Sequence, residues 1–177
     1  MIAFVSGGAR SGKSDFAERL AREWHRARGG RRYYLATARA SDTEMTARIA
    51  RHRRERGDGW FTLEAPLALD TGLARVEDGG TVLLDCLTLW ASQWLYGGGG
   101  PAAQGERLLG ELLTRARGRS IALVVVSNDI NEALPPRDPE VWRYLGFLQR
   151  LHRQLAREAD RVVEVVAGLP IDWKEAR

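Results

Sequence analysis

A glycine-rich stretch near the start of the sequence has the residue types and spacing of a phosphate-binding loop. It matches the pattern G-x-x-x-x-G-K-[ST]. Its members are Gly7, Gly8, Ala9, Arg10, Ser11, Gly12, Lys13 and Ser14. In such a loop the backbone N–H groups surround phosphates, the lysine reaches the β- and γ-phosphates, and the serine hydroxyl is a ligand for Mg²⁺. The stretch therefore predicts a nucleotide site, but it does not specify a reaction.

The flanking residues predict the elements that this loop needs. Residues 2–5 are apolar over the length of a strand, and residues 15–24 place apolar side chains on one face of a helix. A strand, a glycine loop and a helix in this order direct N–H groups and the positive end of the helix at an anion.

A carboxylate further along the chain is the second candidate for chemistry. Residues 81–84 form an apolar strand-like run that ends in Asp85. Phosphate-loop enzymes commonly hold Mg²⁺ with a carboxylate at this position of a strand. Many strands end in aspartate, so the assignment depends on the loop. Together they predict Ser14 and Asp85 as metal ligands.

The remaining pattern alternates strands and helices. We predict strands at 32–36, 60–64, 121–126 and 161–167, and helices at 41–56, 67–76, 86–96, 106–117 and 140–158, with prolines 135, 136 and 139 in a loop. Such alternation indicates an α/β fold with a mostly parallel sheet flanked by helices. A chain of 177 residues suits one domain, residues 1–177. Thr37 follows a strand, where ligands gather in such sheets.

Among the three histidines, His52 is the candidate for catalysis. A capping box at Ser41 and Glu44 begins its helix, and Met45 and Ile49 share its stripe, so the imidazole is predicted to face inward. It is a candidate nucleophile toward an α-phosphate, a candidate general base, or a packed histidine. His25 and His152 are predicted to be structural.

Composition limits the class of protein. The charged content of 28%, the net charge of +4 and the single cysteine predict a cytoplasmic globular protein with no internal disulfide, and no apolar run has the length of a membrane span. Five arginines lie close together, at positions 48, 51, 53, 54 and 56. They suit nucleic acid, a phosphate-rich small ligand or a solvated helix face.

The sequence resembles the bifunctional adenosylcobinamide kinase / adenosylcobinamide-phosphate guanylyltransferase family of cobalamin synthesis. The resemblance rests on the loop at Gly7 to Ser14 and on Y-L-A-T-A at 34–38, D-x-E-M-x-x-R-I-x-x-H-R at 42–53, R-G-D-G-W-F-T-L-E-A-P at 56–66, V-L-L-D-C-L-T-L-W at 82–90, S-N-D at 127–129, A-D-R-V at 159–162 and A-G-L-P at 167–170. The stretch from 42 to 66 is the most specific part.

The resemblance implies a P-loop NTPase (RecA-like) architecture and two reactions. One phosphorylates adenosylcobinamide with ATP or GTP, and the other transfers GMP from GTP to adenosylcobinamide phosphate through a guanylylated histidine. Mg²⁺ would assist, and the protein would be a homotrimer. By position His52 looks like that histidine. Similarity also suggests nucleotide contacts from the phosphate loop and from Ala36, Thr37, Ala38, Arg53, Arg54, Glu55, Arg56, Glu64 and Asp85.

The sequence departs from the family pattern in three places. Many relatives have two adjacent histidines where this chain has Arg51 and His52, which leaves His52 as the only candidate nucleophile. Residues 130–136 and 142–153 also differ, so the residues for GMP transfer are better matched than those for the kinase step. Two alternatives stay open: a simple P-loop small-molecule kinase without a covalent intermediate, and a nucleotide-switched module that binds nucleic acid.

Overall fold

The computed structural model describes residues 1–38, 43–130 and 138–175. Within one helix, the side chains of Glu44, Met45, Arg48, Ile49, His52, Arg53 and Glu55 lie outside this description. The predicted cap at Ser41 and the prolines at 135 and 136 also lie outside the described residues.

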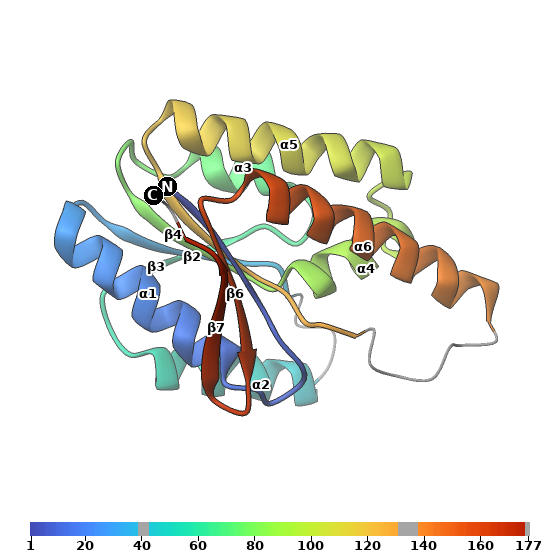
Figure 1. The fold of residues 1–177 in the computed structure, drawn as a ribbon, viewed down its shortest axis with the longest axis horizontal. Coiled ribbons are helices and arrows are strands. Elements are labelled where there is room, and N and C mark those ends of the chain that lie inside the picture. The colour runs from blue at the N-terminus through green and yellow to red at the C-terminus, as the bar shows by residue number, and fades with distance from the viewer. Residues whose placement is uncertain (39–42, 131–137, 176–177) are drawn as a thin grey trace.

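Seven strands form one sheet in the order β3-β2-β4-β5-β1-β6-β7 (Figure 1). Strands β1 to β6 are parallel to their neighbours, and β7 is antiparallel to β6. Their bounds are β1 Ile2–Ser6, β2 Arg32–Ala36, β3 Trp60–Glu64, β4 Thr81–Asp85, β5 Ala122–Val126, β6 Arg161–Val166 and β7 Leu169–Lys174. The α/β class with a mostly parallel sheet is confirmed.

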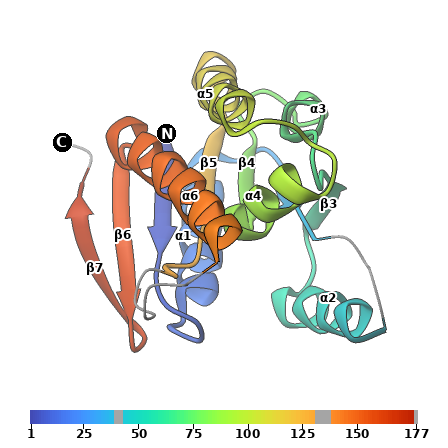
Figure 2. The ribbon, with the colours of Figure 1, turned by 90° about the vertical axis from the view of Figure 1, so that its right-hand side faces the viewer.

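Helices cover both faces of the sheet (Figure 2). Helix α1 packs on one face, and α3, α4, α5 and α6 lie over the other, whereas α2 lies apart from these four. Their bounds are α1 Lys13–Arg28, α2 Thr43–Arg56, α3 Leu69–Ala74, α4 Leu87–Tyr96, α5 Ala102–Gly118 and α6 Pro139–Glu158. None of these helices has both the length and the apolar run needed to cross a membrane.

Each face of the sheet has its own hydrophobic core. Alternate side chains of a strand point to opposite faces, so Ile2 and Phe4 of β1 join the core under α3 to α6, and Ala3 and Val5 join the core under α1. Strand β5 is fully covered on both sides, which explains its continuous apolar sequence. The two cores hold the carboxyl ends of the parallel strands in fixed register.

Two sequence predictions require correction. Pro139 is the first residue of α6, not a loop residue, because its missing N–H is not needed in the first helical turn. The Asp138 carboxylate caps this helix by accepting a hydrogen bond from the Glu140 N–H at 2.8 Å. The strand at 161–166 is also not the last one, since the turn at Ala167 and Gly168 returns the chain as β7.

A carboxylate fastens the amino-terminal strand to the end of α6. Asp160 accepts hydrogen bonds from the Ile2 N–H at 2.7 Å and from the Arg117 guanidinium at 3.0 Å. Burial alone would raise the pKa of this carboxyl, but the Arg117 and Ile2 hydrogen bonds outweigh burial and lower the pKa below its ordinary value. Because the pKa of Asp160 is lower in the folded protein than in the unfolded chain, the ionised carboxylate stabilises the fold at neutral pH. This contribution to the free energy of unfolding is lost as the pH falls through the folded-state pKa.

We therefore expect Asp160→Asn to lower the free energy of unfolding at pH 7 by about 1 kcal/mol. The difference from wild type should shrink in acid, as denaturant titrations at a series of pH values would show. Asp78→Asn is the matched control, because the Asp78 side chain is 74% exposed in its ion pair with Arg119. A larger loss in the control, or a difference for Asp160→Asn that persists in acid, would contradict this assignment.

Candidate nucleotide-binding and transfer site

The glycine-rich loop connects β1 to α1 as the sequence predicts. Lys13 and Ser14 open α1, and Gly12 precedes the helix with a φ of 90°, a conformation that favours glycine. The Lys13 side chain is 8% exposed, and its ammonium donates to the Gly8 carbonyl at 3.0 Å. The buried Ser11 hydroxyl has no hydrogen-bond partner within the described residues. The loop therefore combines a buried cation, an unused hydroxyl and the N-terminus of a sixteen-residue helix.

The turn between β6 and β7 packs directly against this loop. The Gly168 N–H donates to the Ser11 carbonyl at 2.8 Å. A Cβ atom on Gly7, whose φ is 155°, would collide with the Val165 carbonyl oxygen. Glycine at position 7 is thus required by close backbone contact, and β6 supports the loop from one side.

Strand β5 supports the loop from the other side. It lies between β1, which leads into the loop, and β4, which ends in Asp85. Val126 pairs with both Val5 and Asp85, so the loop and the carboxylate flank the end of β5. The Asp129 N–H donates to the Gly7 carbonyl at 2.9 Å. Because β5 separates β1 from β4, the glycine-rich loop and Asp85 lie on either side of residues 127–129, which follow β5.

Asp85 is held by an aromatic side chain that the sequence did not identify as a site residue. The Tyr34 hydroxyl donates to the Asp85 carboxylate at 2.5 Å. Burial and the Asp85 charge raise the pKa of Tyr34, so the phenol stays protonated and remains a donor. The guanidinium carbon of Arg56 lies 3.2 Å from the centroid of the Tyr34 ring. These contacts link the end of α2 to the candidate metal carboxylate.

Arg56 is one of the most buried charged residues in the described part of the chain, at 4% exposure. Its carbonyl accepts a hydrogen bond from the Arg22 guanidinium of α1 at 2.6 Å. The Arg22 guanidinium thus provides a hydrogen-bond donor for a carbonyl at the C-terminal end of α2. The end of α2 is therefore fixed to both α1 and β2.

Thr37 is buried, and its hydroxyl joins the ends of β2 and β4. It accepts from the Cys86 N–H at 2.8 Å and lies 3.1 Å from the Asp85 carbonyl. Gln93 of α4 donates to the Thr37 carbonyl at 2.7 Å. Among the neighbours predicted to contact a nucleotide, Ala36 ends β2 and is half-buried, as is Ala38. In this arrangement Thr37 fixes the backbone beside Asp85.

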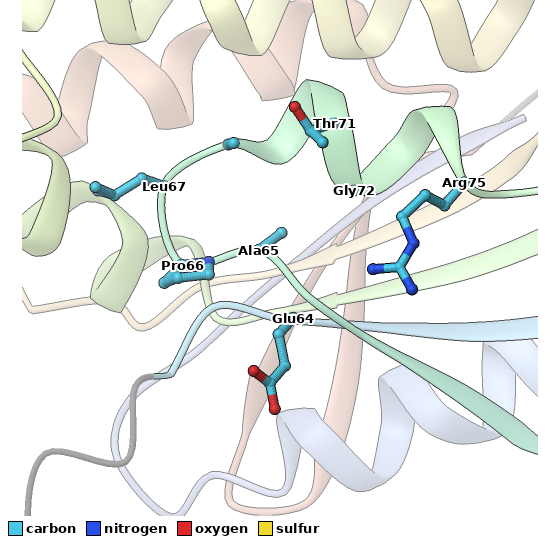
Figure 3. Close-up of a pocket in the computed structure, with 8 residues that line it drawn as sticks. Glu64, Ala65, Pro66, Leu67, Thr71, Gly72 and Arg75 are labelled. Atoms are coloured by element: carbon cyan, nitrogen blue, oxygen red, sulfur yellow. The ribbon is translucent and has the colours of Figure 1, made fainter.

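Glu64, at the end of β3, is one of the residues that line a cavity of about 210 Å³, and its carboxylate points away from Leu67 and Thr71 (Figure 3). The cavity is also lined by Ala65, Pro66, Leu67, Ala68, Thr71, Gly72 and Arg75. The lining therefore combines the Arg75 side chain with a partly apolar wall. A guanidinium can donate hydrogen bonds to the edge of a heterocyclic base.

The predicted residues of α2 are only partly described. The helix spans Thr43–Arg56 and ends before Gly57, as predicted. Arg51 and Arg54 are exposed, and Arg56 is buried. The side chains of His52, Arg53 and Glu55 lie outside the described part, so the predicted inward stripe stays a prediction. The structure thus brings together the loop, Asp85 and Arg56.

A polar cluster next to this site was missed. The hydroxyls of Thr88 and Ser127 lie 2.8 Å apart, and the Ser127 hydroxyl lies 2.7 Å from His152 Nε2. The one sequence signal was the polar triplet at 127–129 directly after the most apolar strand. His152 itself carries no local signal, because its partner lies 25 residues earlier in the chain.

Comparison with known proteins identifies the family. Residues 3–173 match the family described as CobU: Cobinamide kinase / cobinamide phosphate guanyltransferase. The chain belongs to this family. It is an enzyme. The cobinamide kinase / guanyltransferase match includes the loop, the β4 carboxylate and the sheet except for Ile2 and Lys174 at its two ends, so the family resemblance inferred from the sequence is confirmed.

Relatives cover nearly the whole chain. The Bifunctional adenosylcobalamin biosynthesis protein CobP of Pseudomonas aeruginosa is 42% identical over 172 residues, covering 96% of this chain and 95% of that protein. The Bifunctional adenosylcobalamin biosynthesis protein CobU of Escherichia coli is 30% identical over 186 residues, covering 98% and 100%.

Among solved structures, the KaiC-like protein PH0186 from Pyrococcus horikoshii OT3 is similar with a TM-score of 0.51. The match covers 92% of this chain and 69% of that one, at 10% sequence identity. At this identity the likeness concerns the fold alone, and it agrees with the RecA-like arrangement expected for the cobinamide kinase / guanyltransferase family.

Proposed function

We propose that this enzyme transfers GMP from GTP to adenosylcobinamide phosphate through a covalent intermediate on His52, and that it phosphorylates adenosylcobinamide with ATP or GTP. The observation that carries the proposal is the family match over residues 3–173, which includes the phosphate loop, all of α1 and all of β1 except Ile2. Residues 1–177 would act as one catalytic domain in the cytoplasm, and the proposed partners include no nucleic acid.

The GMP transfer would proceed in two displacements. The neutral imidazole of His52 attacks the α-phosphorus of GTP, the bond to the β-phosphate oxygen breaks, and pyrophosphate leaves with that electron pair. The imidazole releases its other proton to solvent. A phosphate oxygen of adenosylcobinamide phosphate then attacks the same phosphorus, the P–N bond breaks, and the imidazole takes up a proton. His52 is thereby regenerated.

The phosphate loop would serve both reactions by binding phosphates. Lys13 and the N-terminus of α1 would supply positive charge to the triphosphate, and the Ser11 hydroxyl, which is buried without a hydrogen-bond partner among the described residues, would donate to a phosphate oxygen. The arginines of α2 would neutralise charge on the departing pyrophosphate. Glu64 and the cavity beside it suit the base, and Ala36, Ala38, Arg53, Arg54 and Glu55 would line the nucleotide.

The two reactions require different phosphorus atoms at the point of attack. The kinase step uses the γ-phosphate and GMP transfer uses the α-phosphate. We expect either a movement of α2 or two poses of the nucleotide. If α2 moves, the contact between Arg56 and the Tyr34 ring should break; if the nucleotide has two poses instead, this contact should persist. Crystals grown with and without GTP would distinguish a movement of α2 from two poses of the nucleotide.

Mg²⁺ is the expected cofactor, and the oxygen donors fit it. Ser14 at the start of α1 and Asp85 at the end of β4 supply a hydroxyl and a carboxylate, which are ligands of the kind Mg²⁺ prefers. No group of three or more His, Cys, Asp or Glu suited to a metal occurs among the described residues. In the proposal the phosphates and water would supply most of the other ligands. When bound, the ion would neutralise phosphate charge.

Tyr34→Phe should lower the apparent affinity of the enzyme for Mg²⁺, because the Asp85 carboxylate loses the hydrogen bond that the Tyr34 hydroxyl donates. We expect the Mg²⁺ concentration for half-maximal activity to rise by about tenfold, the size typical of lost partners around metal ligands. Titration of kinase activity with Mg²⁺ measures this. Tyr33→Phe is the matched control, since among the described residues the Tyr33 hydroxyl accepts a 3.4 Å hydrogen bond from the Glu77 N–H and makes no bond to Asp85. Equal Mg²⁺ dependence in Tyr34→Phe and wild type would contradict the role of Asp85.

A homotrimer is part of the proposal, and the outer strand of the sheet offers a surface for it. Leu169, Ile171 and Trp173 alternate along β7 and are 70%, 44% and 69% exposed. An apolar, exposed sheet edge is typical of strands that are covered in an assembly. Sedimentation equilibrium of the wild type and of Trp173→Lys would test this surface.

The proposed function is tested by incubating the protein with α-labelled GTP and Mg²⁺ in the absence of any corrinoid. We expect label that survives denaturing electrophoresis, is lost in acid and is stable in base, as for a phosphoramidate. Subsequent addition of adenosylcobinamide phosphate should release the label as product. GTP binding without retained label would favour the simple kinase without a covalent intermediate.

A further inference from the structure

The segment directly after β5, residues 127–129, lies between the glycine-rich loop that follows β1 and Asp85 at the end of β4. Ser127 donates its N–H to the Val5 carbonyl at 3.0 Å, and Asp129 donates to the Gly7 carbonyl at 2.9 Å. Asp85 lies on the opposite side, at the end of β4. Any shift of residues 127–129 would therefore be transmitted to the first residue of the phosphate loop.

Side chains from two helices, α4 and α6, hold this segment. Thr88 of α4 accepts a hydrogen bond from the Asn128 N–H at 2.7 Å and lies 2.8 Å from the Ser127 hydroxyl. His152 of α6 completes the Thr88–Ser127–His152 cluster through its 2.7 Å contact with Ser127. Tyr144, also of α6, donates to the Thr88 carbonyl at 2.9 Å. The segment is thus fixed to β1 by its backbone and to α4 and α6 by this cluster.

The cluster is buried and uncharged at neutral pH. Ser127 is fully buried, and Thr88 is 8% exposed. Burial lowers the pKa of His152 to about 4, with the Asp129 charge opposing the shift. A neutral imidazole beside a buried hydroxyl is a directional hydrogen-bond partner and a poor base at pH 7. The geometry therefore favours positioning over proton transfer.

We infer that His152 is a positioning residue for transfer from the nucleotide: through Ser127 it holds residues 127–129 against Gly7 of the phosphate loop. This inference rests on the proposed function and assigns a role in it to α6. Phosphate binding itself would depend on the loop N–H groups and Lys13, whereas His152 contacts Ser127 and the Phe4 ring. Loss of His152 should therefore reduce the rate of transfer more than the affinity for nucleotide.

The test compares His152→Leu with His152→Gln. Leucine removes the hydrogen bond, and we expect kcat for transfer of the γ-phosphate to fall by about tenfold to hundredfold, with the KM for nucleotide changed less than about threefold. Glutamine places an amide near the position of Nε2, and that amide can donate or accept, so His152→Gln should recover most of kcat. An unchanged kcat in His152→Leu would overturn the inference.

Two further measurements separate a positioning role of His152 from a general loss of protein stability. Phe147→Leu alters a fully buried α6 side chain that packs near Trp90 and is not part of the cluster, so it should lower the Tm without lowering kcat. A loss of kcat in Phe147→Leu equal to that in His152→Leu would overturn the inference. If His152→Leu does not fold, Ser127→Ala removes the same link and should show the same split between kcat and KM.

A double-mutant cycle gives the final criterion. Because His152 acts through Ser127, the double variant should be no slower than the slower single variant. Independent, additive losses would contradict the inference. If wild type transfers no phosphate to adenosylcobinamide, the proposed function fails, and the same comparison is made on the slow release of γ-phosphate from ATP to water.

Discussion

His52→Ala should leave the protein folded but unable to retain GMP. The covalent intermediate needs an unprotonated imidazole nitrogen, and alanine supplies no nucleophile. In the incubation with α-labelled GTP we expect the adduct to fall by a factor of at least about 10³, as for loss of other enzymatic nucleophiles. Phosphorylation of adenosylcobinamide needs no such nucleophile and should persist within a few-fold of wild type.

The remaining histidines provide the controls. His25 lies in the last turn of α1, and its Nδ1 is buried without a hydrogen-bond partner among the described residues. His25→Ala should retain the label, and so should His152→Gln at a similar final level. Adduct formation by His52→Ala would disprove the assignment. Loss of the label together with the fold, judged by Tm, would show a structural role instead.

Local sequence pattern predicted the elements that end at the site. Residues 32–36 and 60–64 are strands with the predicted bounds, because aromatic and aliphatic side chains are concentrated in both ranges and glycines lie shortly before each of them. Lys13 and Ser14 lie inside α1, although periodicity placed its start at residue 15. Apolar periodicity missed the first two residues because side chains in the first turn of a helix at a phosphate site are polar. They are available to a ligand and do not pack in the hydrophobic core.

Long-range pairing explains what the sequence did not predict. The order of the strands, with β5 between β1 and β4, depends on how separate helices pack on the two faces. Strand β7 was missed because its side chains are exposed and it contains Pro170, both unusual for a strand inside a sheet. The link from Arg56 through Tyr34 to Asp85 joins residues 22 and 51 positions apart, so no local window contains it.

Lys13→Ala should abolish both reactions, because both need the triphosphate held in the loop. The Lys13 ammonium is nearly buried and already faces the loop, where it donates to the Gly8 carbonyl. Charge-assisted hydrogen bonds to phosphate contribute about 1.5–3 kcal/mol each. We therefore expect the Kd for GTP to rise by roughly tenfold to hundredfold and the rates at saturating nucleotide to fall further, since in the proposed mechanism Lys13 would also stabilise charge that develops during transfer.

Lys13→Arg distinguishes the geometry of the cation from its charge. A guanidinium is larger, planar and rigid, and the loop closes on Lys13 with the side chain 8% exposed. Arginine should therefore restore part of the affinity and little of either rate. Arg19→Ala, which removes an exposed cation from α1, should change neither Kd nor rate measurably. Calorimetric titration with GTP, combined with both activity assays, measures these quantities. A Lys13→Ala variant that still forms the labelled adduct at the wild-type rate would mean that GMP transfer does not use this loop, and the two reactions would then require separate nucleotide sites.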